Sequence, residues 1–372
     1  MKHPSICAEK QFLLSNLRSI NLSSHQNVVM KSFLFFVLLA SIVFSCSKET
    51  EEKCAFIPET SAIKITLQIE SLEDSLPSIT DKKQLVSFFT YHKELRDIFF
   101  NRPAYPSDSV FVNSRYNMFS NPHIDTLLME THKVFGKNEE LKTEMAQAFV
   151  NLKYYYPDFQ IPKVETVITG LETDLFVSDS LIIIGLDYYL GEKAKYKPDM
   201  YEYMQRRFNK NFITPSVMLL YGIDGAFNKT NLSDKTVLAE MITYGKAYYF
   251  AKQMQPCIAD SILIGYTKQE IEGSRKNESL IWSRLIEDDV LFSTSHKIKQ
   301  RYISERPKTL EVGEKCPGRI GSWVGWQIVK KYMEEHPDVT LPQLMQMTDA
   351  SKLFKESHYK PKVVKVPKGK KI

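Results

Sequence analysis

Apolar residues recur at helical spacing along much of the chain, and this pattern predicts a mostly helical protein. Helices are expected over residues 82–100, 137–155, 199–208, 234–254, 268–291 and 318–335, with a last one starting near residue 341. Pro157 is expected to end the helix over 137–155, because proline cannot continue the hydrogen-bond ladder. Ser233 is expected to cap the helix that starts at 234.

The pattern changes between residues 162 and 191, where short β-rich runs replace the helical spacing. These runs cover residues 164–168, 175–177 and 181–186, and the polar residues 178–180 offer turn chemistry between the last two. A hairpin is therefore expected within a small sheet. The predicted fold class is α+β, mostly α, with this sheet packed on a helical body.

The segment from residue 30 to residue 46 follows neither pattern. Lys31 precedes an apolar run over 33–44, which is followed by Ser45 and Cys46. The run has about a dozen residues, whereas a membrane-spanning helix needs about 20. The order resembles a bacterial lipoprotein signal, in which the chain is cleaved before Cys46 and the thiol is acylated, for example by palmitate. This order disfavours the alternative, a buried core segment of a cytosolic protein.

These features divide the chain into five segments. Met30 is a better start for a signal than Met1, so residues 1–29 are interpreted as an N-terminal extension without function. The others are a signal peptide (30–45), a flexible tether (46–60), a single domain (61–358) and a basic, disordered tail (359–372). This organisation predicts a lipid-anchored protein of the cell envelope that faces the periplasm or the cell surface.

Charge adds little to this picture. The whole chain carries +5, but residues 1–45 hold +3 and the tail holds six lysines, so residues 46–359 carry −4. No basic stripe interleaved with aromatics is present, which argues against nucleic acid as a partner. The lysine-rich tail is interpreted as a solvated end, with anionic lipid or an acidic partner as the alternative.

Cysteine use limits the cross-links. Once Cys7 and the lipidated Cys46 are set apart, Cys54, Cys257 and Cys316 remain, so at most one disulfide forms among them. No Cys-x-x-Cys spacing occurs, which argues against a structural zinc site.

One helix invites comparison with enzymes. A sheet, a connecting helix and then a helix with an acid is the order found in zinc peptidases of the zincin type, whose active helix carries His-Glu-x-x-His. Here Glu240 is retained, but Ala239 and Thr243 stand at the histidine positions. The fold thus resembles a degenerate zincin-type metallopeptidase that lacks the metal ligands. We expect no bound metal, no cofactor and no catalysis.

A weaker alternative is a divergent envelope peptidase or hydrolase built around Glu240. Glu287 lies where such a fold supplies a third ligand, and these two acids are the weak catalytic candidates. A structural role for Glu240, hydrogen-bonded inside the domain, is favoured because a buried unpaired carboxylate is costly. The histidines of the mature chain are scattered, and structural roles are expected for them.

The segment 318–335 has a small-residue face. Gly321 and Gly325 lie four apart, so another backbone can approach closely there. A tightly packed internal helix is the favoured interpretation. The alternative is a partner-docking surface anchored by Trp323 and Trp326. Arg319 at the helix start opposes the macrodipole, so it is expected to pair with an acid, with Glu240 as one candidate.

Four motifs resemble the gliding motility lipoprotein GldB family. They lie at 185–191 (Gly-Leu-Asp-Tyr-Tyr-Leu-Gly), 238–246, 264–268 and 317–329, and the last is the most specific. The resemblance covers nearly the whole mature chain. It implies a lipid-anchored envelope protein that works with other gliding or secretion proteins and has no established reaction. It leaves open which membrane holds the lipid and which proteins bind.

Overall fold

The structure is a computed structural model that describes residues 54–362, all within one compact unit, Glu52–Ile372. The N-terminal extension, the signal peptide, Cys46 and most of the basic tail lie outside the described residues. Among the described residues, no helix is both long and apolar enough to cross a membrane.

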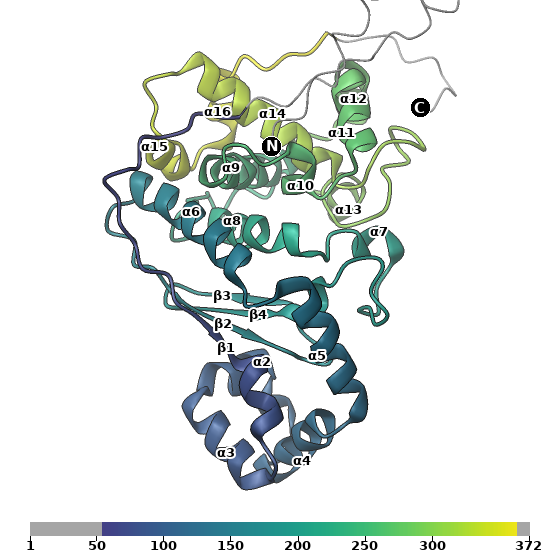
Figure 1. Ribbon diagram of the computed structural model, residues 1–372. Helices are drawn as coiled ribbons and strands as arrows, with labels where there is room; N and C mark the ends of the chain where they lie inside the picture. Colours follow the sequence, from purple (N-terminus) through teal and green to yellow (C-terminus); the bar gives the residue numbers. More distant parts are fainter. Residues whose placement is uncertain (1–53, 363–372) are drawn as a thin grey trace, which may run out of the picture. The chain divides into compact units, whose positions relative to one another are not determined.

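Helices make up most of the described chain (Figure 1). The α-helices are α2 (Leu72–Ser75), α3 (Lys82–Tyr91), α4 (Asp108–Phe119), α5 (Pro122–Phe135), α6 (Glu139–Tyr155), α7 (Glu202–Gln205), α8 (Ile213–Ile223), α9 (Val237–Met254), α10 (Asp260–Ile264), α11 (Lys268–Lys276), α12 (Glu278–Glu287), α13 (His296–Tyr302), α14 (Ile320–Glu335), α15 (Leu341–Gln346) and α16 (Ala350–Glu356). Shorter turns are the π-helix Leu95–Phe99 and the 3-10 helices Leu76–Ser78, Arg102–Ala104, Leu186–Tyr189 and Lys210–Phe212.

The four strands described form one mixed sheet. They are β1 (Ile69–Ser71), β2 (Lys163–Val167), β3 (Leu175–Val177) and β4 (Leu181–Gly185), in the spatial order β1-β2-β4-β3. β1, β2 and β4 run parallel, and β3 pairs antiparallel with β4. The predicted hairpin is confirmed, and its turn is closed by the Ser178 N–H, which donates to the Leu181 carbonyl at 2.9 Å. The predicted class, α+β and mostly helical, is also confirmed, although β1 was not foreseen.

The sheet separates two hydrophobic clusters. Along β4, Ile182 and Ile184 pack into the larger cluster while Ile183 packs into the smaller one, because successive strand residues point to opposite faces. Figure 1 shows α2, α3 and α4 on the side of the smaller cluster, with α6 and α8 on the other side. α9 and α14 pack beyond α8 and carry much of the larger cluster.

Two long helices expected from the sequence are broken. The helix expected over 82–100 stops at Tyr91, where His92 leaves the helical region (φ −111°, ψ 67°), and the chain resumes as the π-helix. The helix expected over 268–291 becomes α11 and α12, which meet at Asn277. The helix expected over 199–208 shrinks to the four residues of α7. Apolar spacing continues through each break, so the pattern alone does not show it.

The helix cap expected at Ser233 is wrong. α9 begins at Val237, and the side chain of Thr236 caps it by accepting from the Ala239 N–H at 3.2 Å. Asp234 supports this cap, because its carboxylate accepts from the Thr236 hydroxyl at 2.7 Å. The start of α9 is therefore fixed by two side chains that precede it.

The close approach predicted for the glycine face of α14 is confirmed. A methyl group built on Gly325 would overlap the carbonyl oxygen of Met241 in α9, and one built on Gly245 would overlap the carbonyl of Gly325. A methyl on Gly321 would meet Ile303 at 2.7 Å. Only glycine permits this backbone-to-backbone contact between α9 and α14, the most extensive helix pair of the described chain.

A disulfide joins Cys54 to Cys257, and Cys316 is a buried free thiol. The expectation of at most one disulfide is thus confirmed for the described cysteines, and the pairing that the sequence left open is settled. Most of the expected tether lies outside the described residues, but Cys54 is cross-linked and Pro58 is buried.

Candidate functional site

A pocket of about 170 Å³ lies along the first turns of α9. It contains all three positions of the His-Glu-x-x-His comparison, together with the loop before α9 and the segment that leads into α16. The lining residues are Lys229, Thr230, Asn231, Leu232, Asp234, Lys235, Ala239, Glu240, Ile242, Thr243, Lys246, Met347, Thr348 and Ala350. The three positions compared with His-Glu-x-x-His therefore lie on a concave surface, and the chemistry of this surface depends on the groups that line it.

Glu240 is held by an ion pair at the edge of this pocket. Its Oε1 lies 2.5 Å from the Nζ of Lys299 in α13, and its side chain is 38% exposed. The prediction that this carboxylate is hydrogen-bonded is confirmed. The prediction that it lies inside the domain is wrong, because the first turn of α9 leaves the side chain partly exposed to solvent. An exposed pair of this kind contributes at most about 1 kcal/mol to stability.

The two positions that flank Glu240 provide no imidazole. Ala239 has no donor atom, and the hydroxyl of Thr243 donates to the Ala239 carbonyl at 2.8 Å. A tetrahedral zinc site of the peptidase type needs nitrogen or sulfur ligands from one helix face. At these positions the α9 pocket offers a carboxylate and a hydroxyl instead.

Lys246, which no motif in the sequence marks as a site residue, places a buried amine in the wall of the same pocket. Its side chain is 1% exposed, and Nζ donates to the carbonyls of Lys229 and Met347, both at 2.7 Å, and of Met345 at 3.4 Å. Burial lowers the pKa of Lys246 to about 8. The sequence does hold one signal for it: a lysine stands within an apolar stretch of the helix. Lysines are seldom fully buried, so a lysine at such a position indicates a special environment.

Glu287 does not join this pocket. It lies at the end of α12 with its side chain 53% exposed, and Oε2 accepts from Arg284 at 2.7 Å. Among residues 54–362 no recorded contact connects it with Glu240. The structure therefore does not bring the two candidate acids together.

Arg319 pairs with an acid, as expected, but the acid is Glu305 and not Glu240. Its Nε lies 3.3 Å from the Glu305 carboxylate, and its terminal nitrogens donate to the Ile264 carbonyl at 2.6 Å and to the Tyr248 hydroxyl at 3.2 Å. The guanidinium thus ties α14 to α9 and α10. Because the charge is neutralised there, a positive side chain is tolerated at a helix start.

Trp323 and Trp326 lie in the core and not on a surface. They are 1% and 0% exposed, and the Nζ of Lys330 lies 3.9 Å from the Trp326 ring centroid. The Trp326 ring packs on Tyr248 of α9, with ring centroids 5.4 Å apart. The interpretation of α14 as a tightly packed internal helix therefore agrees with the structure. A docking surface would require indoles that a partner can reach.

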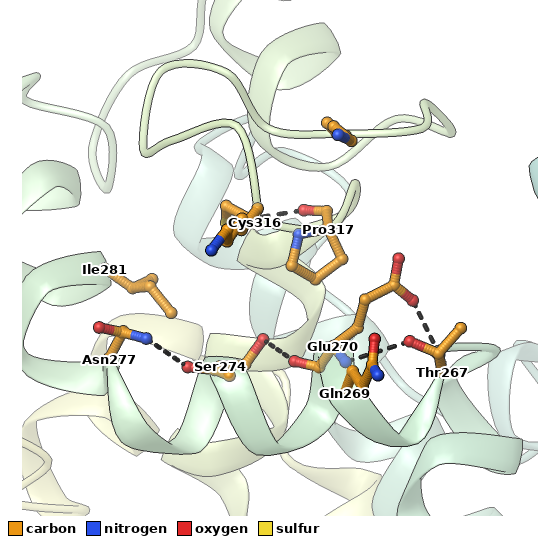
Figure 2. A pocket seen from close by; sticks show the side chains of 11 residues that line it. Thr267, Gln269, Glu270, Ser274, Asn277, Ile281, Cys316 and Pro317 are labelled. Atoms are coloured by element: carbon orange, nitrogen blue, oxygen red, sulfur yellow. Dashed lines mark hydrogen bonds between the residues drawn. The ribbon is translucent and has the colours of Figure 1, made fainter. Parts of the chain in front are cut away.

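A second pocket, of about 490 Å³, lies between α11 and the loop that ends at Pro317 (Figure 2). Polar groups of its α11 wall are already paired. Glu270 and Thr267 form a capping box, Arg206 lies 2.8 Å from the Glu270 carboxylate, and the Ser274 hydroxyl donates to the Glu270 carbonyl at 2.8 Å. Burial raises the pKa of Cys316 to about 12, so this thiol is not a ready nucleophile. The pocket offers shape and apolar contact more than reactive groups.

The protein is thus of the α+β class and mostly helical. In its α9 pocket, the carboxylate of Glu240 and the buried ammonium of Lys246 line the positions where a zinc peptidase would carry its metal ligands. The chain belongs to the gliding motility protein GldB family, whose model matches residues 53–361. This membership links it to gliding motility and, since the family is one of lipoproteins, to the cell envelope. No curated protein and no solved structure matches it.

Proposed function

We propose that this protein is anchored to an envelope membrane by a lipid on Cys46 and serves gliding motility by holding other proteins of the machinery, without catalysis. The observation that carries the proposal is the family match, which covers almost all of the described residues. The lipoprotein-like signal at 30–46 agrees with it.

The disulfide between Cys54 and Cys257 supports a location outside the cytoplasm. Disulfides form and persist in oxidising compartments and are rare in the cytosol. Cys54 follows the proposed lipidation site by eight residues and is bonded to Cys257. The domain would therefore be held close to the membrane through a short connection.

The side chains of the two pockets support a role without catalysis. Glu240 is engaged by Lys299, and the ammonium of Lys246 is engaged by main-chain carbonyls. The thiol of Cys316 has a pKa near 12. General acid–base and nucleophilic catalysis need free groups with a pKa near the working pH. The pKa of Cys316 lies far above that range, and Glu240 and Lys246 are already engaged by the partners named above.

The test replaces Cys46 in cells of the source organism. Cys46→Ser should remove radiolabelled palmitate from the protein and abolish colony spreading while growth continues. Cys7→Ser is the matched control, because that cysteine precedes the signal, and it should leave both labelling and spreading intact. Normal spreading with an unlabelled, soluble protein would refute the proposal.

The alternative function is a divergent envelope peptidase, with the degenerate zincin-type fold as its basis. It is favoured by the order of a mixed sheet, a connecting helix α8 and an acid-bearing helix α9 that lines a pocket. Zinc that is lost from a Glu240→Gln variant, together with peptide hydrolysis by the parent chain, would establish this function. Full spreading by cells that carry Glu240→Gln would exclude the peptidase function. Glu287→Gln tests the second candidate acid in the same way.

A further inference from the structure

Four charged or titratable side chains meet at the start of β2, on the sheet face that α3 covers. Glu70 and Glu165 are register partners on the parallel strands β1 and β2. Parallel neighbours in register point to the same face, so the two carboxylates lie side by side. His92 approaches from the end of α3, and its Nδ1 lies 3.1 Å from Oε1 of Glu165. The break in the helix at His92 is what turns this imidazole towards the sheet.

The three side chains have the geometry of a ligand set. One donor atom from each of Glu70, His92 and Glu165 lies within 4.8 Å of the others. Two carboxylate oxygens and one imidazole nitrogen suit a divalent transition-metal ion, and bond lengths near 2.0–2.2 Å place such donors about 3 Å apart. A water molecule would complete the coordination on the exposed side.

Glu165 provides an independent indication of a missing ligand. Its side chain is 5% exposed, and Oε1 bonds to His92 and Lys163, but its buried Oε2 has no hydrogen-bond partner. Buried carboxylate oxygens are normally paired or bound to a metal. The unpaired oxygen is bonded to the same carbon as the one that meets His92, so it belongs to this cluster.

Lys163 provides the only cation that contacts both carboxylates among the described residues. Its Nζ contacts Glu70 and lies 2.9 Å from Oε1 of Glu165. Two carboxylates thus share this one ammonium. The side chains of Lys163 and Glu70 are 46% and 45% exposed, so the lysine can turn to solvent and an ion can enter on that side.

We propose that Glu70, His92 and Glu165 bind a divalent transition-metal ion, with Zn²⁺ as the best match to the donor set, and that the ion displaces the ammonium of Lys163. The bound ion clips the end of α3 to β1 and β2, and so fastens the smaller hydrophobic cluster to the sheet. This site is separate from the α9 pocket and goes beyond the proposed function. It requires no catalysis.

The binding test uses the full-length chain after metal has been removed with EDTA. Titration calorimetry should show one Zn²⁺ per chain and much weaker binding of Mg²⁺, since imidazole favours zinc over magnesium. Zinc at about 100 times its dissociation constant should raise the melting temperature by about 5 °C. Absence of saturable zinc binding would overturn the proposal.

Variants place the ion. His92→Ala and Glu165→Gln should each weaken zinc binding by at least about tenfold, and so should Glu70→Gln, whose half-exposed position makes it safe for folding. Lys163→Met should bind zinc about tenfold more tightly, because it removes the competing cation. The control is His132→Ala, which breaks an exposed pair with Asp74 at 3.4 Å outside the cluster and should change nothing.

Two further outcomes would reject the site. Zinc binding that survives Glu70→Gln and Glu165→Gln places the ion elsewhere. Zinc binding that is lost in Glu240→Gln instead assigns the metal to the α9 pocket and to the peptidase alternative. Melting curves of each variant without zinc separate lost binding from lost folding.

Discussion

Gly245 of α9 and Gly325 of α14 lie backbone against backbone, and neither position has room for a methyl group. This contact brings the two helices close enough for Met241 to meet Gly325 and for Trp326 to pack on Tyr248, whose ring centroids lie 5.4 Å apart. The larger core therefore depends on two residues that contribute no side chain.

Gly325→Ala should lower the free energy of unfolding by about 3 kcal/mol, because the new methyl group forces α14 away from α9. Urea denaturation measures this loss. Gly273→Ala is the control: it lies within α11 with nothing within 4 Å of the added methyl, and alanine there should be neutral or stabilise by up to about 1 kcal/mol. Equal effects of the two substitutions would contradict the packing argument.

The stability of the protein should depend on the titration of Lys246. Burial lowers its pKa from 10.5 to about 8 in the folded chain, so the unfolded chain binds more protons between these values. The free energy of unfolding should therefore rise as the pH increases from about 8 to 10.5, by about 3 kcal/mol. The gain reflects relief of the cost of burying the charge.

The comparison for this pH dependence is Lys246→Met, which has no ammonium to titrate. Denaturation of both chains at pH 7.5, 9 and 10.5 isolates the lysine, since the tyrosines titrate in both. As the pH rises, the free energy of unfolding of the parent chain should increase relative to that of Lys246→Met. Parallel curves would show that the ammonium is not buried.

Removal of the disulfide should destabilise the protein. Cys54 and Cys257 are separated by 203 positions, and a cross-link over a long loop restricts the unfolded chain strongly. The Cys54→Ser/Cys257→Ser double variant should lose about 3 kcal/mol in urea denaturation under oxidising conditions. With dithiothreitol present, the parent chain should approach the double variant. A parent chain indifferent to reductant would argue against the bond.

Cys316 should resist alkylation in the folded protein. With a pKa of about 12, its thiolate fraction at pH 8 is about a thousandfold below that of an ordinary cysteine. Iodoacetamide should therefore label it slowly in buffer and rapidly in urea, as peptide mass spectrometry can show. Rapid labelling of the folded chain would mean that the pocket between α11 and the loop ending at Pro317 gives solvent access to Cys316.

Local patterns predicted the elements with a strong period. The hairpin of β3 and β4, the helix α6 and the glycine face of α14 were all foreseen, because each is encoded by neighbouring residues. β1 was missed because three residues give no period. α8 was missed because its sequence is almost uniformly apolar, with Pro215 in its first turn. Even its exposed positions carry apolar side chains, Leu220 and Ile223, so no polar face reveals the helix.

The site was less predictable than the fold. Glu240 was found because its neighbours resemble a motif, and Lys246 was passed over although it lies only six residues further on. Glu70, His92 and Glu165 meet only because β1 and β2 pair across more than 90 residues and the chain bends at His92. Contacts set by a parallel strand pairing have no local signature.

The position of Cys54 also governs how the molecule bears a load. Tension applied to the chain ahead of this residue passes through the covalent bond to Cys257, at the junction of α9 and α10. The load thus enters the larger core directly and bypasses the three-residue strand β1, the edge strand that would otherwise be peeled from the sheet first. A protein pulled by its N-terminal end would resist mechanical unfolding for as long as this bond stays oxidised.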